Sequence, residues 1–113
     1  MNKYVSRFNK ETAPKAHLDT ILAGGVLPAG MKAPFGHAWG YLEGKSMMEV
    51  HAHPKDEIYL VFAGRGFCHI GDERFEVKPG DVVEVPPDVM HSMECEDGDT
   101  FLWAAFWWDI ITD

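Results

Sequence analysis

Glycine and proline divide this chain into short apolar segments, and this punctuation limits what it can fold into. Eleven glycines and seven prolines are spread over 113 residues. The runs between them are rich in valine, phenylalanine, tyrosine and tryptophan, which are typical of β-strands, and they are too often interrupted for long helices. We therefore predict an all-β protein of about eight to ten short strands, arranged as a sandwich or barrel.

The length fits a single domain over residues 1–113. Residues 1–17 hold few apolar anchors, and we expect them to form an N-terminal arm or an edge strand. Lys78-Pro79-Gly80-Asp81 has proline and glycine where a type II turn prefers them. The expected strands cover residues 18–23, 35–42, 46–53, 57–63, 67–70, 74–77, 82–85, 91–96 and 100–108.

Charge, hydropathy and cysteine content indicate which partners and which compartment to expect for this chain. The net charge of −8 argues against nucleic acid and against anionic membrane surfaces. No apolar window is long enough for a transmembrane helix, and the N-terminus has no signal-peptide pattern, so we predict a cytoplasmic protein. Its two cysteines, Cys68 and Cys95, are then expected to be free thiols.

Residues 44–64 contain a set of candidate metal ligands. His51 and His53 are two positions apart, and side chains with this spacing project from the same face of a strand. Pro54 ends that strand, and Glu57 opens the next apolar run, so a turn would bring its carboxylate back beside the two imidazoles. Imidazole nitrogen with carboxylate oxygen suits a divalent transition metal, and the set admits Mn, Fe, Ni, Co, Zn or Cu.

Strand alternation also predicts which side chains surround this site. Glu49 shares the face of His51 and His53, and we predict either a place at the solvated mouth or a role as catalytic acid or base. His17, His37 and His69 are isolated histidines for which we predict no direct role. Five further residues are predicted to line a substrate pocket, although core packing is the competing role for each: Met47, Tyr59, Phe67, Met93 and Trp103.

Two segments resemble the conserved motifs of the cupins. Gly44, His51-Ala52-His53, Glu57 and Gly64 match the first motif with one extra residue after Gly44. Residues 80–91, which run from Gly80 through Pro86 to His91, resemble the second. Two positions depart from the pattern, because Asp88 stands where a glycine is usual and Cys95 where an asparagine is usual.

The resemblance implies a conical jelly-roll β-barrel, also called a double-stranded β-helix, with one divalent metal ion. Its four ligands would be His51, His53, Glu57 and His91, which leave open positions for a small-molecule ligand. We predict an enzyme acting on a sugar or carboxylic acid by metal-assisted isomerisation, decarboxylation or lyase chemistry. An iron-dependent dioxygenase and a non-catalytic ligand-binding or sensor module are the alternatives.

The last apolar run predicts self-association. Residues 100–108 are apolar at both parities, so one face of this strand should lie in the barrel and the other should need cover. A second copy of the chain would provide that cover, and we predict a homodimer.

Overall fold

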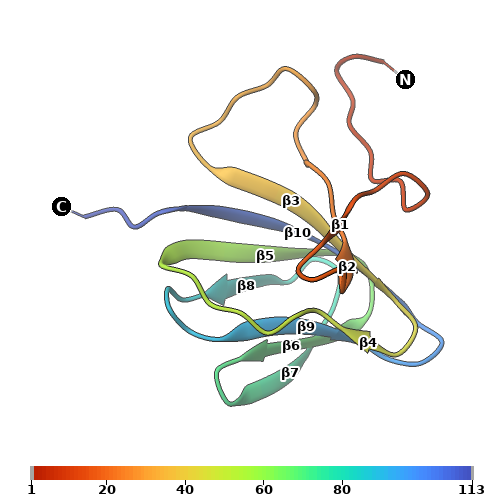
Figure 1. Ribbon diagram of the computed structural model, residues 1–113, viewed down its shortest axis with the longest axis vertical. Coiled ribbons are helices and arrows are strands. Elements are labelled where there is room, and N and C mark those ends of the chain that lie inside the picture. The colour runs from red at the N-terminus through yellow and green to blue at the C-terminus, as the bar shows by residue number, and fades with distance from the viewer. Residues whose placement is uncertain (1, 113) are drawn as a thin grey trace.

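The computed structural model describes residues 2–112, which form two antiparallel sheets packed face to face (Figure 1). The six-stranded sheet has the order β1-β2-β3-β10-β5-β8, and the four-stranded sheet has the order β4-β9-β6-β7. No helix occurs within these residues, so the all-β prediction is confirmed, and the strands form two sheets that are not joined into a closed barrel. The strands are β1 (Lys15–Ala16), β2 (Ile21–Leu22), β3 (Gly36–Glu43), β4 (Ser46–Met47), β5 (Lys55–Gly64), β6 (Gly66–Ile70), β7 (Glu73–Val77), β8 (Val82–Val85), β9 (His91–Cys95) and β10 (Thr100–Asp109).

The predicted strand at 46–53 is wrong over most of its length. Only Ser46–Met47 pairs as a strand, with Glu94 and Cys95 of β9. The chain then leaves the sheet and returns to β9 at one isolated bridge between His51 and His91. Alternation of side chains holds only inside a regular strand, so it does not hold across this interruption.

β10 is the central strand of the larger sheet and is paired on both sides. Its residues Thr100 to Trp107 pair with β3, and residues 101–109 pair with β5, with one register shift at Leu102/Trp103. The inward side chains of β10 belong to the core between the sheets, where Phe101 and Trp103 are almost fully buried. Burial of an aromatic side chain of this size stabilises the fold by about 2–3 kcal/mol before the entropy cost of ordering it.

The N-terminal segment contains both an arm and an edge strand, the two alternatives predicted for it. Lys15–Ala16 is the edge strand of the larger sheet. Residues 2–14 run as an arm over the outer face of that sheet, where the Phe8 ring lies 5.3 Å from Tyr41 and 6.2 Å from Trp39 between centroids. The arm therefore covers part of the outer face of its own chain.

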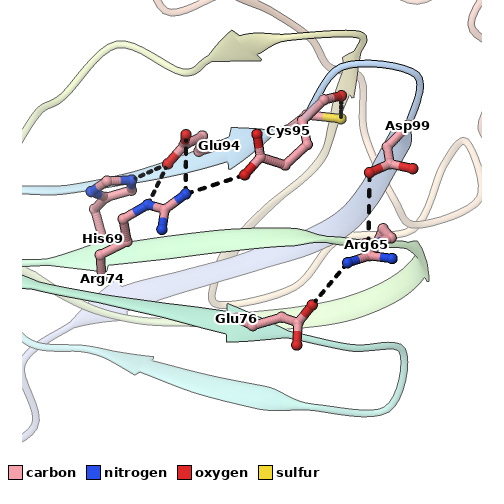
Figure 2. A network of polar contacts seen from close by, with 8 residues as sticks. Arg65, His69, Arg74, Glu76, Glu94, Cys95 and Asp99 are labelled. Atoms are coloured by element: carbon pink, nitrogen blue, oxygen red, sulfur yellow. Dashed lines mark hydrogen bonds and ion pairs between the residues drawn. The ribbon is translucent and has the colours of Figure 1, made fainter.

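The outer face of the four-stranded sheet carries a network of ion pairs (Figure 2). Glu94 accepts a hydrogen bond from Arg74 Nε at 2.9 Å and contacts His69 Nε2 at 2.7 Å. The guanidinium of Arg74 also lies 3.7 Å above the ring centroid of Phe67. Arg74, followed by His69, holds the pKa of Glu94 below its usual value.

The predicted turn at residues 78–81 and the predicted free cysteines are both present in the structure. The turn at 78–81 is closed by Asp81 N donating to Lys78 O, with Gly80 at φ +97°, as in a type II turn. Both cysteines are free and buried. Within residues 2–112 the structure contains no helix with the length and apolar character needed to cross a membrane.

Candidate metal centre

Four side chains from three parts of the chain meet between the two sheets. Glu57 projects inward from β5, and His91 begins β9. His51 is fixed to His91 by two backbone hydrogen bonds of 3.1 and 2.8 Å, and His53 follows it. The structure thus brings together all four predicted ligands, and the nitrogens of the three histidines lie within 4.8 Å of one another.

Backbone carbonyls set the tautomers of two of the imidazoles. His51 Nδ1 lies 2.8 Å from Glu49 O, and His91 Nδ1 lies 2.9 Å from Val89 O. A carbonyl only accepts, so each Nδ1 must carry the proton, and in the neutral ring each Nε2 keeps its lone pair. Burial also lowers the pKa of His51, which favours the neutral ring that binds a metal.

The spacing of the ligand atoms fits one ion. Glu57 Oε1 lies 3.0 Å from His53 Nε2 and 3.3 Å from His91 Nε2. Two ligands bound at about 2.1 Å along perpendicular axes would be about 3.0 Å apart. His91 Nε2 is buried and makes no hydrogen bond within the described chain, despite its closeness to Glu57. A buried nitrogen with a free lone pair needs a partner, and a metal ion fits this one.

The charge of Glu57 points to the same conclusion. Its side chain is only 6% exposed, and its ion pairs within residues 2–112 are with His53 and His91. No lysine or arginine is paired with it there. A buried carboxylate without a cation is costly, and a divalent ion would supply the missing positive charge.

His17 is a residue at this site that sequence reasoning missed. Its ring stacks on His51 at 4.2 Å between centroids, and its Nδ1 lies 3.6 Å from Glu49 Oε1. His17, Leu18 and Asp19 all have positive φ, at 52°, 56° and 61°. Three such residues in a row form a left-handed turn that is unfavourable for side-chain-bearing residues, and no sequence pattern signalled it.

A cavity of about 430 Å³ opens beside His51, His53 and Glu57. This size is within the ordinary range for small-molecule sites. Two predicted pocket residues, Tyr59 and Trp103, lie on its wall. The lining residues are Ala16, His17, Ile21, Ala23, Ala38, Trp39, Met48, His51, His53, Lys55, Glu57, Tyr59, Trp103, Ala105 and Trp107.

The family follows from comparison with known proteins. Residues 39–108 match the family model described as the cupin domain. The chain belongs to the cupin family. The predicted cupin jelly-roll is therefore confirmed, and the four side chains that the cupin motifs imply as ligands lie close together.

Relatives and solved structures agree on the fold. This cupin is 34% identical over 65 residues to an uncharacterised protein of Methanocaldococcus jannaschii; the match covers 58% of the chain and 51% of that relative, so the chain spans about half its length. It is similar to a Cupin 2 conserved barrel domain protein from Salinispora arenicola (24% identity, TM-score 0.81, 93% and 87% of the two chains). It is also similar to the plu4264 protein from Photorhabdus luminescens (29%, 0.77, 96% and 89%).

Three predicted pocket residues of this cupin lie elsewhere. Met47 is 37% exposed on β4, and Met48 lines the cavity in its place, because the chain leaves the strand between Met47 and His51. Phe67 lies under Arg74 on the outer face of the smaller sheet. Met93 points inward but is fully buried in the core, paired with Cys68 in the register of the sheet.

Glu49, the predicted acid or base, does not line the cavity. Its backbone N–H donates to Thr20 Oγ1 at 2.9 Å, and its carboxylate faces His17. The assumed strand parity with His51 and His53 is lost, because residues 48–50 lie outside any strand. Its side chain is 30% exposed, and one of its carboxylate oxygens lies within 4.8 Å of a ring nitrogen of His17 and of His51.

The two departures from the cupin pattern, Asp88 and Cys95, lie at different distances from the candidate ligands. Asp88 adopts φ +63°, a left-handed conformation that glycine and, less easily, aspartate can take. Its N–H donates to His53 O at 2.8 Å, so the loop still supports a ligand. Cys95 lies four residues from His91 on β9, about 13 Å along the strand, and is buried beside Ser46 rather than at the ligands.

Tyr59 gives the cavity one neutral polar group. Its ring is 2% exposed and lies 6.0 Å from His91 and 6.1 Å from Trp103 between centroids. Burial, followed by the charge of Glu57, raises the pKa of Tyr59 well above its ordinary value. The phenol therefore stays protonated and offers a hydrogen bond without adding charge.

Proposed function

We propose that this cupin is a metal-dependent enzyme that acts on a small molecule bound through oxygen atoms, by isomerisation, decarboxylation or lyase chemistry. The observation that supports this most directly is Glu57, a buried carboxylate that lies within ion-pair distance of His53 and His91 but of no lysine or arginine among residues 2–112. Such a set lacks a cation at its centre. The adjoining cavity gives a substrate access to that centre.

Each ligand residue has a defined part in the proposal. His51, His53, His91 and Glu57 would hold one divalent transition metal ion, which would act as a Lewis acid on substrate oxygens. The carbonyls of Glu49 and Val89 fix the rings of His51 and His91 in the tautomer that presents Nε2. Four protein ligands leave positions free in a six-coordinate ion, which distinguishes a catalytic site from a closed structural one.

The surrounding residues orient the site and exclude water. His17 closes the His51 side of the cavity, and we assign Glu49 the role of orienting the His17 ring. Tyr59 supplies a hydrogen bond from the wall. Most of the remaining lining is apolar, so substrate binding would displace water and strengthen polar interactions at the ligand end.

Metal content and turnover test the proposal separately. Elemental analysis of protein purified without added metal should show about one ion per chain, and the double variant His53→Ala/Glu57→Ala should lose it. His69→Ala is the matched control, because this histidine also contacts a glutamate but lies on the outer face. Absence of any metal after reconstitution would refute the site.

Turnover is then measured on hydroxy acids and sugars with the metal-loaded protein. Activity that disappears in His51→Ala, with circular dichroism unchanged, supports the enzyme. Ligand binding without turnover of any compound would replace the enzyme with a non-catalytic binding module.

We also propose that the chain forms a homodimer through the outer face of its larger sheet. β5 and β8 place Phe62 and Val82 on that face with 59% and 61% of their surface exposed, whereas the Phe8 ring of the arm packs on Trp39 and Tyr41. Light scattering at micromolar concentration should give twice the chain mass, and Phe62→Glu should give a monomer. A monomeric parent protein would refute the dimer.

A further inference from the structure

Most of the cavity wall lies away from the candidate metal ligands. It would contact the body of a bound ligand, while the oxygens of that ligand reach the metal end. Ten of the fifteen lining residues are alanine, isoleucine, methionine, tyrosine or tryptophan. Four of the other five, His17, His51, His53 and Glu57, are gathered at the metal end. The fifth, Lys55, is already paired with Asp109. A sugar carries hydroxyl groups along its whole length and would find few partners on this wall.

Two tryptophans on β10 build the wall together with glycines on β3. In the register of the sheet, Trp103 faces Gly40 and Trp107 faces Gly36. A Cβ atom at either glycine would collide with the indole opposite. Each indole therefore lies against the β3 backbone, in space that only a glycine leaves open.

Between the two tryptophans the wall is made of alanines. Ala105 pairs with Ala38 of β3 and with Tyr59 of β5. Trp103 and Trp107 are four residues apart, which is about 13 Å along a strand. The small alanine side chains leave a gap between two aromatic groups, and the Tyr59 ring borders that gap.

This gap is connected to the metal centre. Trp107 pairs in register with Glu57, a predicted metal ligand, and Tyr59 is two positions further along the same face of β5. A ligand whose oxygens reach the metal end would therefore lay its body over Ala38 and Ala105. Aromatic rings gain by stacking on indole and phenol faces.

We propose that this cupin binds planar aromatic compounds that carry a chelating pair of oxygens, such as a ring hydroxyl beside a carboxylate. The proposal rests on the proposed metal-dependent function and narrows its substrate class. The chelating pair binds at the end formed by the histidines and Glu57, and the ring system packs against Trp103, Trp107 and Tyr59. Gly36 and Gly40 determine the size of ring that fits.

The test uses three ligands that each carry a hydroxyl and a carboxylate able to chelate an ion and that differ in the body bearing this pair. Glycolate, salicylate and 3-hydroxy-2-naphthoate are titrated into Zn²⁺-loaded protein, with calorimetry and tryptophan fluorescence as readouts. Affinity should increase in that order, by about 100-fold or more from first to last, because each ring adds buried apolar area and stacking. Equal affinity for glycolate and the naphthoate would overturn the proposal.

The chain supplies a matched control in its neighbouring tryptophans. Trp107→Ala should weaken naphthoate binding by about tenfold and leave glycolate binding unchanged, and Trp107→Phe should restore part of the loss. Trp108→Ala removes the adjacent tryptophan, which does not line the cavity, and should change neither affinity. Equal effects of Trp107→Ala and Trp108→Ala would contradict the proposed wall.

The same titrations distinguish failure of the metal site from failure of the aromatic site. If calorimetry detects no Zn²⁺ binding while metal-free protein still binds the naphthoate through Trp107, the proposed metal function fails and the aromatic site stands. If Zn²⁺ and glycolate bind but added rings bring no gain, the metal function stands and the aromatic site fails.

Discussion

Two glutamates of this cupin each contact histidines, and their surroundings differ in one respect. On the outer face, Glu94 has His69 and also the guanidinium of Arg74, so its charge is balanced by the protein (Figure 2). Between the sheets, Glu57 has two histidines and no such cation within residues 2–112. Pairing of histidine with glutamate therefore does not identify a metal site. The missing cation, together with a buried imidazole nitrogen that has no hydrogen bond, is what supports the proposed site at Glu57.

Replacing the inner glutamate should have the largest effect. Glu57→Gln keeps the shape of the side chain and removes its charge, so Zn²⁺ affinity should fall by about 100-fold or more in competition with a chromophoric chelator. Glu94→Gln should leave the affinity unchanged. In metal-free protein Glu57→Gln should melt higher than the parent, because the buried charge is gone. A lower melting temperature there would show that the protein alone balances Glu57.

Removal of the ion should have the next largest effect. An ion at 100 times its dissociation constant stabilises the fold by about 2.7 kcal/mol, which for a domain of this size is on the order of 10 °C in melting temperature. Scanning fluorimetry with and without EDTA measures the shift. The His53→Ala/Glu57→Ala variant should show none, and a shift of equal size in that variant would place the ion elsewhere.

The outer pair should matter less and should depend on pH. The pKa of Glu94 is lowered in the fold by Arg74 and then His69, so its contribution is present above the unfolded pKa of about 4.3 and is lost as pH falls through the lower folded value. Glu94→Gln should lower the melting temperature by a few degrees at neutral pH, and the difference should disappear as the pH falls below the lowered folded pKa. A difference that persists there would mean that packing, and not charge, stabilises this cluster.

The smallest expected effect concerns the reactivity of Cys68 on β6. This strand carries one side chain in the outer ion-pair cluster and the next in the interior between the sheets. β6 directs His69 to the outer cluster and Cys68 to the interior, where burial raises the pKa of the thiol to about 12. Iodoacetamide at pH 8 should therefore label Cys68 on the order of 1,000-fold more slowly in folded than in unfolded protein, as measured by peptide mass spectrometry. Rapid labelling of the folded protein would show that water reaches this interior.

The sequence predicted the fold and the converging ligands for physical reasons that can be identified. Glycine and proline bounded most strands to within a few residues, because turns require their special conformations. His51, His53, Glu57 and His91 were found through the two-motif resemblance. The bridge between His51 and His91 joins positions 40 residues apart, and no local pattern specifies such a pair.

Side-chain direction was harder to predict than strand position. Met47 was placed in the pocket by parity, and it lies outside because the strand ends after it. Phe67 was assigned to the inner face, but Arg74 from the neighbouring strand covers it. Trp107 and the glycines of β3 were missed, because their contact depends on the register between strands more than 60 residues apart.

The loop at Asp88 shows which substitutions the backbone next to His53 can accept during evolution. Its left-handed turn is held by the hydrogen bond from Asp88 N to His53 O, and it survives with a residue other than glycine. Aspartate, asparagine and glycine all tolerate this conformation, at differing cost. A lineage can therefore exchange them without passing through a form whose ligand His53 has lost its support. Position 88 is thus a place where an exposed side chain can change its charge while the backbone contact to His53 stays as it is.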